Sequence, residues 1–124
     1  MRSLHIASTK YTPQVAFDPD TGVLELAGSS YPENAMEFFR PINAWLEEFV
    51  AATDKPIVVN LAFDYLNTTS SKCILDLLEI IGRYGRRSGR VAVNWQYDKN
   101  DEDMLECGKD YAEDSGLPFT MLPH

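Results

Sequence analysis

One short segment of the chain gathers residues that could carry chemistry: Asp64-Tyr65-Leu66-Asn67-Thr68-Thr69-Ser70-Ser71-Lys72. Four consecutive hydroxyl residues stand where an apolar run gives way to an amphipathic pattern, which is typical of a strand passing into a helix. Asn, Thr and Ser are preferred helix N-caps, and Asn67, Thr68 or Thr69 could each cap this helix. One cap needs only one such residue, so the surplus hydroxyls favour a second role.

That second role is phosphorylation. The first turn of a helix exposes unpaired N–H groups and the positive end of the helix dipole, both of which stabilise a phosphate. Lys72 points the same way, because a cation in a first turn opposes the dipole and gains little in the unmodified protein. A phosphate on Thr68 would lie four residues before Lys72, at the spacing of an i,i+4 helical pair. These residues predict either a phosphorylation switch at Thr68 or plain capping of the helix.

No catalytic or metal-binding constellation accompanies this segment. The sequence contains no P-loop, no G-x-G-x-x-G, no G-x-S-x-G and no H-E-x-x-H. His5 and His124 lie near opposite ends of the chain, so neither a nucleophilic triad nor a zinc site is indicated. Asp64 follows an apolar run but has no catalytic partner. We therefore predict a protein that is not an enzyme and that holds no metal and no cofactor.

Composition limits the partners. The chain has 19 acidic and 11 basic residues, a formal net charge of −8, which disfavours nucleic acid and anionic lipid surfaces. No run of eighteen apolar residues predicts a membrane span, the start does not resemble a secretory signal, and the cytoplasm is the expected compartment.

Cys73 and Cys107 lack a CxxC partner and are interpreted as reduced, buried thiols. The segment 83–90 carries four arginines, which either complement the end of a helix or contact an anion or a partner.

The elements that position the hydroxyl segment alternate between strands and helices. A hairpin is expected over 14–17 and 23–27, and Ser30 with Glu33 has capping-box spacing for a first helix, which Pro41 should kink or split. Further strands are expected over 57–63, 91–97 and 118–122, with helices over 69–84, stopped by Gly85 and Gly89, and from after Asn100 to Gly116.

Repeated β-α-β units imply parallel pairing and right-handed crossovers. The strands over 57–63 and 91–97 alternate apolar and polar residues, whereas a strand covered on both faces would be apolar throughout. The predicted fold is α/β: a two-layer sandwich with a mixed sheet, the helices packed mainly on one face, and a single domain over 1–124.

Three motifs in register carry a resemblance to a known family. The stretches 28–34 (GSSYPEN), 65–72 (YLNTTSSK) and 93–98 (VNWQYD) resemble the S-Y-P-E-N, Y-L-N-T-S-S-x-K and W-x-Y-D motifs of the SiaC family of bacterial regulatory phosphoproteins. The resemblance extends from Leu4 to Phe119. The sequence departs from the second motif at Thr69, where the family has serine, and at Ser71, where an apolar residue is expected.

The resemblance implies a STAS-like fold, similar to anti-anti-sigma factors, with Thr68 as the phosphorylated residue. Thr69 and Ser70 are less favoured acceptors, and Tyr65, Asn67, Thr69, Ser70 and Lys72 form the implied switch and partner-binding segment. In that family a dedicated kinase adds the phosphate and a PP2C-type phosphatase removes it. The unphosphorylated form activates a diguanylate cyclase, which raises cyclic di-GMP and promotes biofilm formation or aggregation.

Two other functions remain open at this point. An anti-anti-sigma factor would use the same fold and the same switch, but would bind an anti-sigma kinase and control transcription. A small-ligand-binding domain would use the uncovered face of the sheet or the arginines of 83–90.

Overall fold

Six strands form one sheet in which every strand pairs with its neighbours in the chain, in the order β1-β2-β3-β4-β5-β6. The computed structural model describes all of residues 1–124. Its strands are β1 (Leu4–Ile6), β2 (Gln14–Asp18), β3 (Val23–Ser30), β4 (Ile57–Leu66), β5 (Val91–Tyr97) and β6 (Phe119–Pro123), and its helices are α1 (Ala35–Ala52), α2 (Thr68–Ser88) and α3 (Glu102–Ser115).

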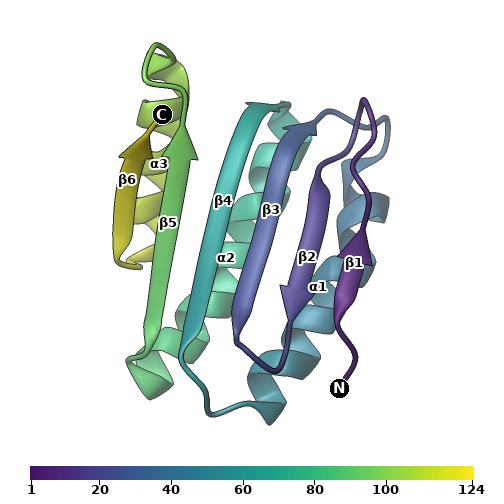
Figure 1. Cartoon of the computed structure of the whole chain (residues 1–124), viewed down its shortest axis with the longest axis vertical. Helices are drawn as coiled ribbons and strands as arrows, with labels where there is room; N and C mark the ends of the chain where they lie inside the picture. Colours follow the sequence, from purple (N-terminus) through teal and green to yellow (C-terminus); the bar gives the residue numbers. More distant parts are fainter.

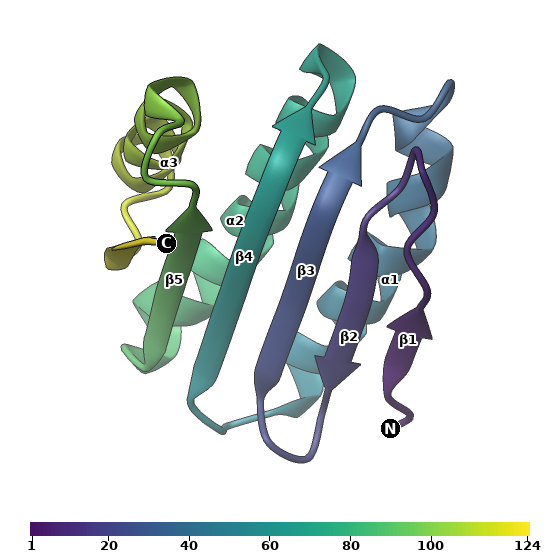
Figure 2. The same ribbon diagram turned by 45° about the horizontal axis from the view of Figure 1, so that its top comes forward.

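The sheet is mixed, and all three helices cover the same face of it. β1, β2 and β3 pair antiparallel, whereas β3, β4, β5 and β6 pair parallel through the crossovers that contain α1, α2 and α3. Each crossover advances to the next strand in the same direction, so right-handed connections place every helix on one side. Figures 1 and 2 show the helices behind the sheet and its front face uncovered. The predicted two-layer α/β sandwich is confirmed.

The core lies between the sheet and the helices and follows the alternation seen in the sequence. On β4 the odd-numbered residues Ile57 to Phe63 are buried, and on β5 the buried residues are Val93 and Trp95. The opposite face of the same strands is more polar, and there the Asn94 side-chain amide donates to Asn60 Oδ1 over 2.9 Å. One face of the sheet is therefore hydrophobic and packs against the helices, while the other face is in contact with solvent.

Trp95 fixes the position of α3 over β5. The indole is fully buried and donates from Nε1 to the Met104 carbonyl over 3.0 Å. Gly108 lies against the ring, where an added Cβ would come within 2.5 Å of it. Tyr111, one turn further along α3, meets the same ring edge-on at 5.5 Å between centroids.

The start of α1 differs from the expectation. Ser30 is not a helix cap but the last residue of β3, and the N-cap is Asn34, whose side chain accepts from the Glu37 N–H over 3.1 Å. Pro41 lies inside α1 without splitting it, because the buried face of this helix packs on the sheet and offsets the hydrogen bond that proline cannot make.

Two other features of the fold differ from the prediction. α2 continues past Gly85 to Ser88 and ends at Gly89, which adopts the left-handed conformation at φ 71°. β1 was not expected, because three residues carry too short a pattern, and it forms by pairing with β2. The third helix lies where it was predicted, with Gly116 ending α3 at φ 70°, and the last strand begins and ends one residue later than the predicted 118–122.

Candidate functional site

The hydroxyl segment forms a tight junction between β4 and α2. β4 continues to Leu66 and α2 begins at Thr68, so Asn67 alone connects them. The expected strand over 57–63 is therefore three residues too short, and the expected helix start at Thr69 is one residue late. Strand pairing with β3 extends this far, through Ser29 with Tyr65 and Ser30 with Leu66, and it leaves no loop.

Asn67 is the N-cap of α2. Its Oδ1 accepts from the Ser70 N–H over 2.8 Å, and its carbonyl accepts from the Ser71 N–H over 2.9 Å. Its own N–H donates to the Ser30 carbonyl over 2.9 Å, which ties the cap to the end of β3. Of the three residues that could have capped this helix, the structure therefore uses Asn67 and leaves Thr68 and Thr69 free of that role.

The four hydroxyl residues point in different directions. Thr68 and Thr69 are exposed at the first two positions of α2. Ser70 is fully buried, and its Oγ lies 2.7 Å from the Oγ of Ser30, which is also fully buried. Modification of the Ser70 hydroxyl would require the first turn of α2 to leave the sheet, whereas Thr68 and Thr69 are open to solvent.

Ser71 joins the same turn to α3. Its Oγ lies 2.8 Å from the Tyr111 hydroxyl, and the Tyr111 hydroxyl donates to the Ser71 carbonyl over 2.8 Å. Burial raises the pKa of Tyr111 well above its ordinary value near 10, so this phenol stays protonated at neutral pH. The head of α2 is thus held to β3 on one side and to α3 on the other.

Lys72 is exposed one helical turn after Thr68. The chain contains two ion pairs, Arg83 with Glu47 and Lys109 with Glu106, and Lys72 takes part in neither. Thr68 and Lys72 both line a groove of about 630 Å³ between α2 and α3, whose other wall carries carboxylates of α3. The ammonium group is therefore available to an anion on Thr68.

Tyr65, at the end of β4, belongs to a row of three tyrosine rings. It meets Tyr31 edge-on at 5.8 Å between centroids, and Tyr31 meets Tyr11 in the same way at 5.3 Å. Tyr65 is 54% exposed and Tyr11 51% exposed. Tyr31 follows β3 and Tyr11 lies between β1 and β2, so three separate segments supply the row.

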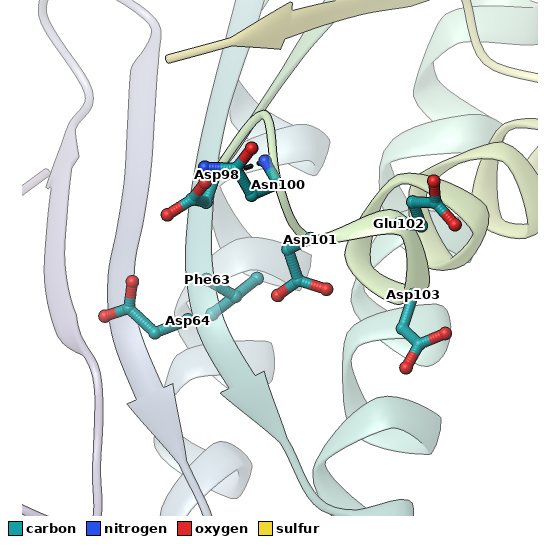
Figure 3. A pocket seen from close by; sticks show the side chains of 7 residues that line it. All are labelled: Phe63, Asp64, Asp98, Asn100, Asp101, Glu102 and Asp103. Carbon is teal, nitrogen blue, oxygen red and sulfur yellow. Dashed lines mark hydrogen bonds between the residues drawn. The ribbon is translucent and has the colours of Figure 1, made fainter.

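A second pocket lies beyond the carboxyl ends of β4 and β5 and is strongly acidic. It is lined by Phe63, Asp64, Asp98, Asn100, Asp101, Glu102 and Asp103 (Figure 3). Asp101 caps α3 by accepting from the Met104 N–H, and Asp98 accepts from the Asn100 N–H within the preceding turn. The carboxylates splay apart in Figure 3, and no group of three His, Cys, Asp or Glu residues in the chain is arranged to hold a metal ion. Asp64 shares this pocket with carboxylates from the segment after β5 and from the start of α3.

The arginines of 83–90 mostly serve the fold. Arg83 pairs with Glu47 at 2.5 Å, Arg87 donates to the Val50 carbonyl over 2.7 Å, and Arg90 donates to the Asp54 carbonyl. These contacts join the end of α2 to the end of α1, where unpaired carbonyls need donors. Arg86 is the one arginine of the four without such a contact.

Both cysteines are free thiols, but only Cys73 is buried, while Cys107 is half-buried on α3. Burial is the main cause that raises the pKa of each thiol, which keeps both in the weakly nucleophilic protonated form at neutral pH.

Three residues that shape the site escaped sequence reasoning. The spacing of Ser30 and Glu33 predicts a helix cap rather than a buried contact. Tyr111 belongs to the apolar side of α3, whose other residues only pack against the core. Tyr11 lies in a segment without periodicity. The sequence held one signal: Ser30 and Tyr31 both lie within the motif over 28–34. Ser30 makes the contact with Ser70, and Tyr31 is the middle ring of the tyrosine row.

None of the helices is both long and apolar enough to cross a membrane.

The family model for the SiaC family regulatory phosphoprotein matches residues 6–124. A curated but uncharacterised protein of Pseudomonas aeruginosa strain UCBPP-PA14 is 35% identical over 124 residues, which is 100% of this chain and 98% of that protein.

Solved structures agree with this match. The structure of SiaC of Pseudomonas aeruginosa has a TM-score of 0.93 at 34% identity, with 100% of both chains covered. The crystal structure of the diguanylate cyclase SiaD in complex with its activator SiaC, also from Pseudomonas aeruginosa, contains a chain with a TM-score of 0.92 at 35% identity, covering 98% of this chain and 99% of that one.

Proposed function

This chain belongs to the SiaC family of regulatory phosphoproteins, and from that premise we propose that it binds and activates a diguanylate cyclase while Thr68 is unphosphorylated. The solved relative SiaC is the activator of the cyclase SiaD. Phosphorylation of Thr68 releases the cyclase, so the protein sets the level of cyclic di-GMP and, through it, biofilm formation.

The observation that carries the choice of Thr68 is the N-cap of α2. Because Asn67 already caps the helix, the Thr68 hydroxyl is exposed at the first helical position and is not needed for the cap. Thr69 is the second choice, since it is also exposed. Ser70 enters the proposal as a residue that positions the turn, because its buried hydroxyl contacts Ser30.

A phosphate on Thr68 suits the folded state. It would lie at the positive end of a helix of 21 residues, with Lys72 four residues further on. The modification would therefore leave the fold intact and change only the surface. This is what a reversible switch requires.

The same phosphate opposes a partner packed on the head of α2. It adds about −1.5 to −2 charges and three acceptor oxygens, which an interface would have to bury or neutralise. Leaving a charge buried and unpaired in an interface typically costs about 2–5 kcal/mol, roughly 30-fold to several-thousand-fold in affinity. Tyr65, Asn67, Thr69 and Lys72 surround Thr68 and form the rest of the proposed switch surface.

The remaining parts of the proposal follow from this role. A dedicated protein kinase and a PP2C-type phosphatase act on Thr68, and the protein works as a single regulatory domain in the cytoplasm rather than as an enzyme. The small-ligand alternative loses one of its two candidate sites, because three of the four arginines of 83–90 have partners inside the chain.

The test is a cyclase assay with purified SiaD of Pseudomonas aeruginosa. Wild type and Thr68→Ala should raise its rate of cyclic di-GMP synthesis, and Thr68→Glu should not. Thr120→Glu, the same exchange at an exposed position of β6, is the matched control and should activate like wild type. Full activation by Thr68→Glu would contradict the switch, and no activation by wild type would contradict the function.

A further inference from the structure

We propose that the tyrosine row Tyr11–Tyr31–Tyr65 is the anchor on which the cyclase docks through an uncharged, apolar strip of side chains. This inference rests on the proposed function and names the contact surface that the Thr68 switch controls.

The row is the main concentration of exposed apolar side chains in the chain. Five large hydrophobic residues are exposed: Met1, Tyr11, Met36, Tyr65 and Leu122. Tyr11 and Tyr65 are the two ends of the row, and Met36 lies at the start of α1, five residues after Tyr31. The end of β4, which carries Tyr65, and the start of α1, which carries Met36, lie at the same end of the molecule (Figures 1 and 2), and Tyr11 reaches this end through its contact with Tyr31. Rigid tyrosines gathered in this way are typical of the energetic centre of an interface.

The backbone that carries the rings is held in place. The Tyr31 N–H donates to the Tyr11 carbonyl over 2.9 Å, which joins the segment before β2 to the end of β3. Within the first of these segments, Thr9 Oγ1 accepts from the N–H groups of both Tyr11 and Thr12. The rings also meet edge-on, the geometry in which aromatic pairs attract. A surface ordered before binding loses little conformational entropy on binding.

The charge around the row indicates what would bind there. The charged residues next to the three tyrosines in the chain are Lys10, Glu33 and Asp64, and the carboxylates of α3 line the groove that Thr68 and Lys72 share. The chain as a whole carries −8. The three rings carry no charge, so the row itself is complementary to an uncharged apolar strip, whereas the acidic groove between α2 and α3 would suit a basic one.

This surface explains why a phosphate at Thr68 would act on binding. Thr68 follows Tyr65 by three residues, so their Cα atoms are at most about 11 Å apart. Phosphorylation would add about −1.5 to −2 charges at the margin of an apolar contact. An apolar strip offers that charge no partner, whereas a basic strip would be attracted by it.

Calorimetric titration with purified SiaD of Pseudomonas aeruginosa tests the inference. Tyr11→Ala and Tyr65→Ala should each weaken binding at least tenfold, with the thermal unfolding midpoint of each variant close to that of wild type. Leu122→Ala, an exposed apolar side chain on β6 at the far edge of the sheet, is the matched control and should bind like wild type. If Tyr65→Ala fails to fold, Tyr11→Ala decides the test, because its side chain lies outside the strands and helices.

The outcomes separate this inference from the proposed function. Wild-type affinity in both tyrosine variants, together with loss of binding in Thr68→Glu, would overturn the docking surface and leave the switch standing. An equal loss in Leu122→Ala would also overturn it, since the contact would then not be confined to this end. Absence of binding by the wild-type chain would overturn both.

Discussion

The hydroxyl oxygens of Ser30 and Ser70 lie 2.7 Å apart in the interior, and they join residues 40 positions apart in the chain. Ser30 is the last residue of β3 and Ser70 is the third residue of α2. Both side chains are completely buried, so each hydroxyl depends on the other for its partner.

Removing both hydroxyls should therefore cost less than the sum of the two single removals. Ser30→Ala or Ser70→Ala leaves one buried hydroxyl unsatisfied, which typically costs about 1–3 kcal/mol. The double variant removes both polar groups, and its loss should be smaller than the sum of the two single losses. Urea unfolding of the four proteins measures this coupling. Strictly additive losses would mean that the two hydroxyls do not depend on each other.

The caps of α2 give a second prediction. Asn67→Ala should lower the free energy of unfolding by about 1 kcal/mol, because the Ser70 N–H loses its acceptor. Thr68→Ala and Thr69→Ala should stay within about 0.5 kcal/mol of wild type, since both side chains are exposed and neither caps the helix. Chemical denaturation distinguishes these cases. A loss for Thr68→Ala as large as that for Asn67→Ala would assign the capping to the wrong residue.

Lys72 should act on the modified protein only. Once Thr68 is phosphorylated, the ammonium group of Lys72 favours the doubly charged form of the phosphate. It therefore holds the second pKa of the phosphate below its ordinary value of about 6. Lys72→Ala should raise that pKa in a phosphorus NMR titration and leave the stability of the unmodified protein almost unchanged. An identical titration curve for both proteins would place Lys72 out of reach of the phosphate.

Two glycines should respond in opposite ways to alanine. At Gly108 a Cβ would lie 2.5 Å from the Trp95 ring, so Gly108→Ala should cost about 1–3 kcal/mol or more by forcing α3 off β5. At Gly82 the nearest atoms would be 3.5 Å away, and Gly82→Ala should stabilise α2 by up to about 1 kcal/mol. Thermal unfolding of the two variants measures the difference, and equal shifts would contradict the packing of Trp95 on Gly108.

Because Tyr111 is buried, we expect the free energy of unfolding to fall at high pH. Its pKa is raised in the folded protein by burial, so the unfolded chain releases this proton first as the pH rises. The folded state then binds more protons than the unfolded state, and stability falls as the pH rises above about 10, the ordinary tyrosine pKa. Tyr111→Phe should be less stable at pH 8 but should lose less on going to higher pH. Parallel pH profiles for the two proteins would contradict the assignment.

The sequence predicted the layers of the fold better than the junctions. The alternation over 57–63 and 91–97 was enough to predict a sheet covered on one face, because burial on one side sets a period of two. The end of β4 was not predictable in this way, because pairing with β3 extends it through Tyr65 and Leu66 after the alternation has stopped.

Within the site, local chemistry was predictable and long-range contacts were not. The helix start, the surplus hydroxyls and the spacing of Thr68 and Lys72 all depend on neighbours in the chain. Ser30, Tyr111 and Tyr11 reach the site from other elements, and no periodicity in their own segments reveals a partner 20 or 40 residues away. Ser30 was misassigned because Ser and Glu three residues apart also occur where a strand simply ends.

Because the strand order of the sheet is the order of the chain, each strand pairs with the strand that was synthesised just before it. The contact between Ser30 and Ser70 can form once α2 has been synthesised. The contact between Ser71 and Tyr111 must wait for α3, which follows α2 in the chain. The first turn of α2, which carries Thr68, can therefore be anchored to β3 first and to α3 only after that helix has been made.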